Sequence, residues 1–325
     1  MPDISELNGN PLANMSEFDG IPFYAGVPVP TAAYSVRLLG SGVGVSSYTG
    51  PAMRVRRDTN LTTGDDDEAD IAFDSGVISL DSAISNASVG VTATTLGQFL
   101  NVGTVGGTTY TNPDSLTVTA SCWVDEWKDQ SGNGNHITQG TFGSQPQIHD
   151  GTVNTDLIRT NGEPSILFGT ASKMQVSSIT YSSPSDRLDT YAVVLFNSLP
   201  SASPTYNGSV GFFDNQIRSV ANQNNLRAMN SSVRLGPSIS TSTQYSAYWR
   251  LGGTYTDDAS LNLSSAINGG TLTGLTSGTI NPNVLQINQD NLSNMNLQEM
   301  LVYNPPSDQA RATIELDING YFSIY

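Results

Sequence analysis

Short apolar segments, each bounded by residues that favour turns, recur along the chain and limit the folds that it can adopt. Six of them read as strands, at residues 165–168, 191–196, 208–213, 245–251, 279–287 and 297–303. Residues 52–56 and 71–80 alternate in the same way, the latter with a turn at Ser75-Gly76, whereas residues 34–39 fit either a strand or a short helix. Many short strands in regular succession predict an antiparallel sandwich.

Only the C-terminal end has convincing helical periodicity. Four apolar residues fall there on one helical face, and a serine and an aspartate precede them as N-cap and first-turn acid: Ala310, Ile314, Ile318, Phe322, Ser307 and Asp308. Charged residues make up only 13% of the 325 residues, and 31 glycines accompany abundant Ser, Thr and Asn. This composition favours short strands and turns over helices.

The net charge of -16 argues against several classes of partner. Such a surface repels phosphate, so we expect neither nucleic-acid binding nor binding to anionic lipid. No apolar run approaches membrane-spanning length, and the first ten residues lack the pattern of a targeting signal, so we expect synthesis in the cytoplasm and no membrane insertion. Cys122 is the only cysteine, which excludes an internal disulfide and predicts a small buried apolar side chain.

Residues 4–12 and 15–23 are two copies of one pattern, in which Asn8-Gly9 and Asp19-Gly20 are typical turn residues. Each copy is too short to form a core, and a proline-rich link at 27–30 follows. We interpret residues 1–32 as an N-terminal docking arm and residues 33–325 as the main domain; an ordered arm on its own domain is the alternative. The predicted assembly residues are Ile4, Leu7, Leu12, Met15, Phe18, Ile21 and Phe23.

Residues 127–139, WKDQSGNGNHITQ, resemble the DQSGNGNHLTQ signature of the GH54-type arabinofuranosidase catalytic domain. Residues 48–58, 161–164 and 303–325 are similar to other segments of that domain. The resemblance implies an all-β, concanavalin A-like antiparallel β-sandwich (jelly roll) with a short C-terminal helix and an extended N-terminal arm.

Four motifs also resemble a group of phage virion proteins: AYSxRxL starting at Ala33, GPxxxVRR at 50–57, WxDQSGNGN at 127–135 and a closing helix motif at 298–325. This resemblance is closer than that to the enzymes. It implies a virion surface protein, as a capsid decoration, head fibre or tail fibre component made in the host cytoplasm. The implied partners are other virion proteins, bound through the arm, and a host surface glycan, and we expect a homo-oligomer.

The resemblance to the enzymes also implies where catalytic residues would lie. By this resemblance, Asp290 occupies the place of the family's acid/base, but Arg227 stands where the family has its nucleophilic glutamate. A retaining glycosidase needs two carboxylates, so we predict that the chain is not an enzyme and that Asp290 is vestigial. A glycan-binding adhesin and an active arabinofuranosidase are the alternatives.

Two further clusters are candidate binding sites. Trp127, Asp129 and Asn133, with Asp290, are the candidates for carbohydrate binding, although a structural turn with a buried Trp127 is the favoured interpretation of the first three. Asp65, Asp67 and Asp70 offer oxygen ligands for calcium, although such a run is more often a solvated loop. We predict no other cofactor.

Overall fold

The computed structural model describes residues 26–58, 67–176, 179, 188–198, 217–222, 225–230, 232–251, 263–270, 285–288, 294–304 and 310–325, together with four two-residue strands near the N-terminus. In those four strands and in residues 217–236, 251 and 263–265, the description is limited to the backbone.

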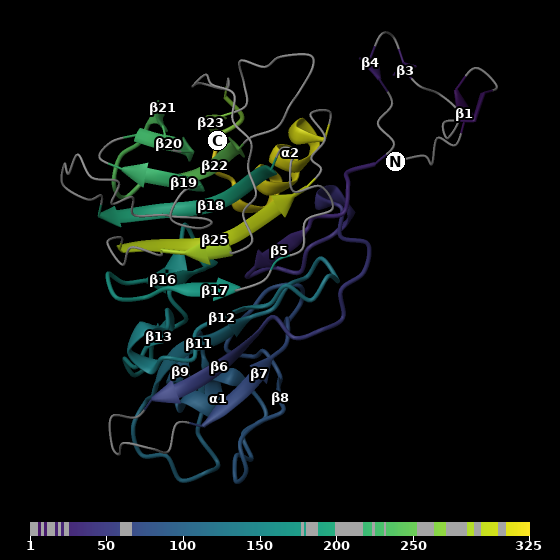
Figure 1. The fold of residues 1–325 in the computed structure, drawn as a ribbon. Coiled ribbons are helices and arrows are strands. Elements are labelled where there is room, and N and C mark those ends of the chain that lie inside the picture. The colour runs from purple at the N-terminus through teal and green to yellow at the C-terminus, as the bar shows by residue number, and fades with distance from the viewer. Residues whose placement is uncertain are drawn as a thin grey trace.

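One antiparallel sheet of 14 strands passes through the described part of the chain (Figure 1). Its main path is β23 (Leu263–Ile267), β22 (Gln244–Leu251), β18 (Leu188–Ser198), β25 (Asn294–Tyr303), β16 (Ile166–Phe168), β13 (Gln147–Asp150), β11 (Ser121–Trp127), β12 (Ile137–Thr138), β17 (Met174–Val176) and β24 (Leu285–Ile287). Strand β5 (Ala32–Ser35) pairs with β25. Next to β11 follow, in order, β6 (Met53–Asp58), β7 (Glu68–Ile71) and β8 (Ile84–Ser85).

Smaller strand groups complete the fold. A three-stranded sheet of β19 (Ile217–Asn222), β20 (Asn225–Asn230) and β21 (Ser232–Ser238) contacts β22 and β23 and lies in front of them in Figure 1. The antiparallel pairs are β9 (Gly103–Val105) with β10 (Thr108–Tyr110), β14 (Arg159–Thr160) with β15 (Glu163–Pro164), β1 (Glu6–Leu7) with β2 (Asn10–Pro11), and β3 (Glu17–Phe18) with β4 (Ile21–Pro22). The last two pairs flank the predicted turn residues of the N-terminal repeat, whose apolar side chains lie outside the described residues.

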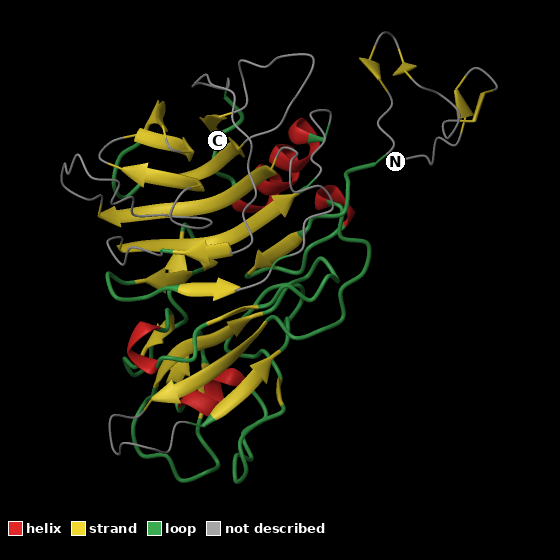
Figure 2. Ribbon diagram, in the orientation of Figure 1, coloured by secondary structure: helices red, strands yellow, loops and turns green. Residues whose placement is uncertain are grey.

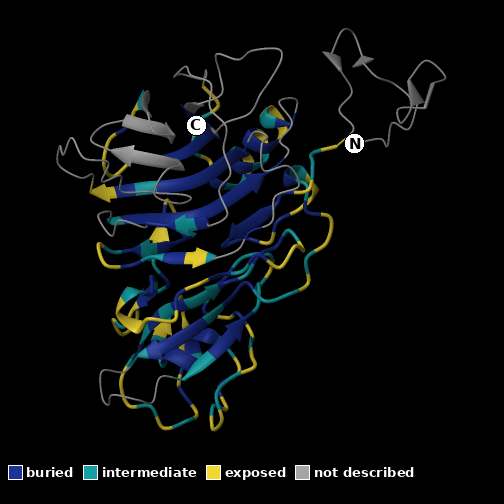
Figure 3. Ribbon diagram, viewed as in Figure 1, coloured by how far each residue is buried: buried dark blue, intermediate teal, exposed yellow. Residues whose placement is uncertain are grey.

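A continuous apolar core fills the inside of the sheet, where β18, β25 and β5 are buried almost throughout (Figure 3). Its largest fully buried side chains include Trp127, Trp249, Tyr34, Phe99 and Phe168. Cys122 is also fully buried, as predicted. The prediction of an all-β sandwich is confirmed.

Two α-helices lie beside the sheet in the described residues (Figure 2). Helix α2 (Arg311–Phe322) buries the predicted face, but its N-cap is Ala310 rather than Ser307. Helix α1 (Leu96–Leu100) was not predicted, although Thr95 caps it by accepting a hydrogen bond from the backbone N–H of Gln98. The sequence carries this signal as Thr-x-x-Gln, the pattern of a capping box. No helix in the described residues has the length and apolar character needed to cross a membrane.

Most predicted strands have counterparts. The ambiguous segment 34–39 contributes to β5, and the predicted turn at Ser75-Gly76 has positive φ angles at both residues. Of the segment 71–80, Ile71 ends β7, and two isolated bridges follow. Strand β11 was missed, although it pairs with β6, β12 and β13, and β13, β17, β19, β20, β21 and β23 were missed as well. The predicted strand 208–213 and residues 279–284 lie outside the described residues.

A buried ion cluster attaches α2 and the segment after β5 to strand β25. The Arg37 guanidinium donates to both carboxylate oxygens of Glu299, at 2.8 and 3.1 Å, and to Asp317 of α2 at 2.5 Å. Ser35 also donates to Glu299, which is fully buried. Burial opposes the charge of Arg37, but Glu299 and Asp317 raise its pKa above the usual value. The cluster therefore contains a buried cation with two fixed anions.

We expect Glu299→Gln to destabilise the fold by about 3–5 kcal/mol, because it leaves a buried guanidinium without its main counter-charge. Equilibrium unfolding in urea measures this change. Arg159→Gln is the control, since its ion pair with Asp156 has side chains that are 36% and 35% exposed and should contribute at most about 1 kcal/mol. Equal losses in the two variants would contradict a role for the cluster in stability.

Candidate functional site

The signature segment 127–135 forms a turn whose carboxylate bonds to the backbone. One oxygen of Asp129 accepts from the N–H of Ala33 at 2.8 Å and of Ser131 at 2.9 Å. The other oxygen accepts from the Ser131 hydroxyl at 2.8 Å and the Asn135 N–H at 2.9 Å. Asp129 is only 1% exposed, so its carboxylate is occupied by the protein itself.

The same segment covers the free edge of β5. Gln130 donates to the carbonyls of Ser35 and Arg37 and accepts from the N–H of Leu39, while its own N–H donates to the carbonyl of Ala33. The Trp127 indole donates to the Ser35 carbonyl at 3.3 Å. In this way the turn supplies the bonds that a neighbouring strand would give to β5.

These contacts decide between the two interpretations of the turn. Trp127 has no exposed surface, so its ring cannot stack on a sugar. Asn133 is exposed, but its amide donates to the carbonyls of Pro30 and Thr31 at 3.0 and 3.1 Å. The structural interpretation accounts for Trp127, Asp129 and Asn133, and it ties the proline-rich link to the main domain.

The acidic segment is engaged by arginines where it is described. Asp67 binds Arg57 at 2.5 Å, and Asp70 accepts from Arg54 at 3.2 Å and from Asn86 at 2.7 Å. Asp65 lies outside the described residues. Within those residues, no group of three His, Cys, Asp or Glu side chains has an arrangement that could hold a metal ion. A calcium site therefore stays a sequence-based prediction.

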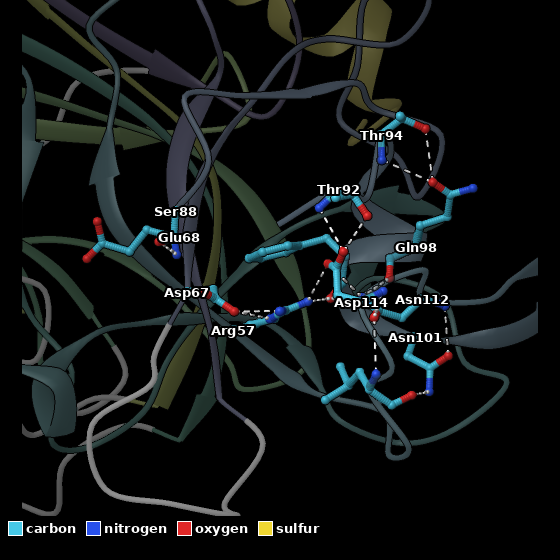
Figure 4. A network of polar contacts seen from close by, with 12 residues as sticks. Arg57, Asp67, Glu68, Ser88, Thr92, Thr94, Gln98, Asn101, Asn112 and Asp114 are labelled. Atoms are coloured by element: carbon cyan, nitrogen blue, oxygen red, sulfur yellow. Dashed lines mark hydrogen bonds and ion pairs between the residues drawn. The ribbon is translucent and has the colours of Figure 1, made fainter. Parts of the chain in front are cut away.

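Figure 4 shows how Arg57 joins this segment to the loops around α1. Its guanidinium donates to the carbonyl of Phe99 and lies 3.6 Å from Asp114. Asp114 accepts from both the N–H and the hydroxyl of Thr92, at 2.7 and 2.6 Å. Burial opposes ionisation of Asp114, but the bonds from Thr92 and the charge of Arg57 lower its pKa. These contacts fix loops rather than form an open site.

The two catalytic positions implied by the family resemblance are not brought together within the described residues. Asp290 belongs to the connection 289–293 between β24 and β25 and lies outside them. Arg227 lies in β20, opposite Val220 and Leu235, where the description is limited to the backbone.

Amide side chains occupy the end of the sheet where this connection joins β25. Asn197 of β18 donates to the side-chain oxygens of Asn294 and Asn296 at 2.8 and 2.9 Å. Planar amides carry both donors and acceptors, as the recognition of sugar hydroxyls requires.

A second polar cluster, missed at the sequence level, lies around Asp125 in β11. Gln145 donates to Asp125 at 3.0 Å and accepts from Arg56 at 2.8 Å, linking the two charged side chains. Burial, followed by the negative charge of Glu68, raises the pKa of Asp125. A carboxyl with a raised pKa beside other charged groups is a feature that binding and catalytic sites often share.

Comparisons with known proteins find solved structures of similar fold that are glycoside hydrolases. One similar solved structure is a GH54 α-L-arabinofuranosidase soaked with a cyclic sulfate inhibitor, with 15% identity, a TM-score of 0.51, and coverage of 89% of this chain and 62% of that chain. Another is an arabinofuranosidase complexed with arabinofuranosyl-α-1,2-xylobiose, with 14% identity, a TM-score of 0.51 and the same coverage. This chain thus spans about three fifths of the length of these enzymes. A Trypanosoma rangeli sialidase covers 60% of this chain at 12% identity and a TM-score of 0.41. No protein-family model and no curated protein sequence matches the chain.

These similarities contradict the prediction that the chain is not an enzyme. The two solved structures described above, which share its fold over 89% of its length, are arabinofuranosidases. That prediction depended on placing Arg227 opposite a family glutamate in a segment of weak similarity. A shift of a few residues brings another side chain to that position, so one arginine does not establish a loss of activity.

We expect Asp125→Asn to raise the melting temperature at pH 7. The pKa of Asp125 is higher in the folded chain than in the unfolded chain. The fold therefore becomes less stable as the pH rises through the interval between the two pKa values, and at neutral pH the charged carboxylate is destabilising. Asparagine removes the charge and still accepts from Gln145. The gain in melting temperature should disappear at a pH below the pKa values of Asp125 in both the folded and the unfolded chain. Thermal unfolding at a series of pH values measures this.

Asp150→Asn is the control with the opposite sign. Although burial raises the pKa of Asp150, hydrogen bonds from Thr152 outweigh this effect and lower it. This substitution should therefore reduce stability at pH 7. Destabilisation by Asp125→Asn at pH 7 would mean that the arginines stabilise the charged form, contrary to this account.

Proposed function

We propose that the chain is a glycoside hydrolase that acts on neutral glycans bearing arabinofuranosyl groups. The observation that carries the proposal is the fold shared with arabinofuranosidases over 89% of the chain. The amides of Asn197, Asn294 and Asn296, beside the connection to β25, support it.

Retaining glycosidases use two carboxylates about 5 Å apart, one as acid/base and one as nucleophile. We assign the acid/base role to Asp290, which occupies the family's place between β24 and β25. The resemblance places the family's nucleophile segment near residues 225–229. Asp214, Asp257 and Asp258 are the only carboxylate side chains in the surrounding residues 199–262, so we propose to seek the second carboxylate among these three.

We expect Asp290→Asn to lower kcat/KM for 4-nitrophenyl α-L-arabinofuranoside by about 10²–10⁴-fold, the usual contribution of acid/base catalysis. One of Asp214→Asn, Asp257→Asn and Asp258→Asn should abolish turnover, and Asp150→Asn, which changes an exposed carboxylate at the end of β13, should leave it unchanged. Release of arabinose from arabinoxylan provides a second measurement. Absence of turnover of both substrates by the unmodified chain would overturn the proposal.

We further propose that this glycosidase acts at the surface of a phage particle and that residues 1–25 attach it there. The four motifs shared in order with virion proteins support this location, and the repeated apolar pattern of the arm supports attachment to other virion proteins or to further copies of the chain. A host surface glycan is then the proposed substrate.

Deletion of residues 1–25 should leave a folded chain that no longer joins particles or oligomers. The truncation ends before Pro30, because the carbonyl of that residue binds Asn133. Sedimentation with purified particles measures the loss of particle binding, and light scattering measures the loss of oligomers. Unfolding of the truncated chain, or normal assembly, would show that the arm belongs to the main domain.

A further inference from the structure

A row of cross-strand neighbours shares one face of the sheet; two of its members, Arg56 and Asn296, are buried. Its members pair in register from β7 to β25: Glu68, Arg56, Trp123, Gln147, Leu167 and Asn296. Directly opposed residues in a sheet project from the same face. Trp123, Gln147 and Leu167 are partly exposed, whereas Val124, Ile166 and Phe168 beside them in sequence are fully buried.

We propose that this face, centred on Trp123, Gln147 and Leu167, binds a neutral glycan. The inference goes beyond the proposed hydrolase, since it concerns a binding surface rather than the reacting groups. From Trp123 to Leu167 the partly exposed part of the row crosses two strand spacings, or about 10 Å, which suits a short stretch of polysaccharide.

Trp123 is the first observation that favours a sugar. The other two tryptophans, Trp127 and Trp249, have no exposed surface. Trp123 is partly exposed, and its indole N–H is buried without an acceptor among the described residues. A rigid apolar ring that is partly exposed suits a sugar, which presents an apolar C–H face.

The groups around Trp123 add planar hydrogen-bonding side chains and a second ring. Arg56 lies 4.6 Å from the ring centroid of Phe142, which is 53% exposed, and Gln145 fixes Arg56 relative to Asp125. Gln147, on the other side of Trp123, offers a partly exposed amide. Rings, amides and a carboxylate held in place together resemble a binding surface more than a packed interior.

The distribution of charged side chains on this face favours an uncharged ligand. The cations on and beside this face already have carboxylate partners: Arg54 with Glu68 at 2.8 Å, Arg56 with Asp58 at 3.6 Å, and Lys128 with Glu126 at 2.6 Å. The chain as a whole carries a net charge of -16. Phosphates and acidic sugars would be repelled, whereas a neutral glycan meets no such penalty.

Affinity electrophoresis in gels containing neutral arabinoxylan tests the proposal. The chain should be retarded by arabinoxylan and not by the anionic polymer polygalacturonate. Trp123→Phe, Gln147→Ala and Phe142→Ala should each weaken binding by about twofold to tenfold, in the range of one aromatic or hydrogen-bonding contact. Leu316→Ala is the control, because this residue of α2 is an apolar side chain that is 69% exposed outside the row.

A second measurement uses tryptophan fluorescence. Acrylamide should quench Trp123 selectively, because the other two tryptophans are buried, and arabinoxylan should protect it. Turnover of 4-nitrophenyl α-L-arabinofuranoside should be unchanged in the three variants. Retardation without any turnover would overturn the proposed hydrolase and leave this inference standing. Absence of retardation, or retardation that persists in Trp123→Phe combined with Gln147→Ala, would overturn the inference.

Discussion

The fold depends on how β5 is kept in place, since among the described strands this short strand pairs with β25 alone. Its other edge would expose backbone groups inside the protein, which is costly unless each finds a partner. Asp129 and Gln130 provide those partners with side-chain atoms, and Trp127 adds a third. Because β5 leads into Arg37 and its buried pair with Glu299, the turn also positions the ions that attach α2.

This role changes what the signature can say about function. Its residues stabilise a sandwich whether or not that sandwich is an enzyme, so enzymes and non-enzymatic relatives can share it. Resemblance at 127–135 therefore predicted the fold correctly and gave no information on activity. The prediction of an inactive protein depended on Arg227, which lies in a segment where no motif is shared with the enzymes. The comparisons contradicted that prediction.

Local patterns explain which elements could be predicted from the sequence. Helix α2 was found because Ala310, Ile314, Ile318 and Phe322 repeat at helical spacing and all become buried. Helix α1 has only five residues, too few for a periodic signal, so only the capping pattern at Thr95 marks it. Strand β11 was missed because a bulge between Val124 and Glu126 interrupts its alternation. The Asp125 cluster depends on pairings between segments far apart in sequence, which no local pattern shows.

Charge connects the fold to the kind of ligand that the chain can accept. With 13 basic residues against 29 acidic ones, the described arginines that fix loops and helices are already paired, as Arg37, Arg54 and Arg57 illustrate. A cation that holds Glu299 or Asp67 in place is not available to bind a phosphate or an acidic sugar. Recognition then has to come from groups without net charge, namely rings, amides and hydroxyls. Trp123, Gln147 and the amides of Asn197 and Asn294 are groups of that kind, and neutral sugars are the ligands that they suit.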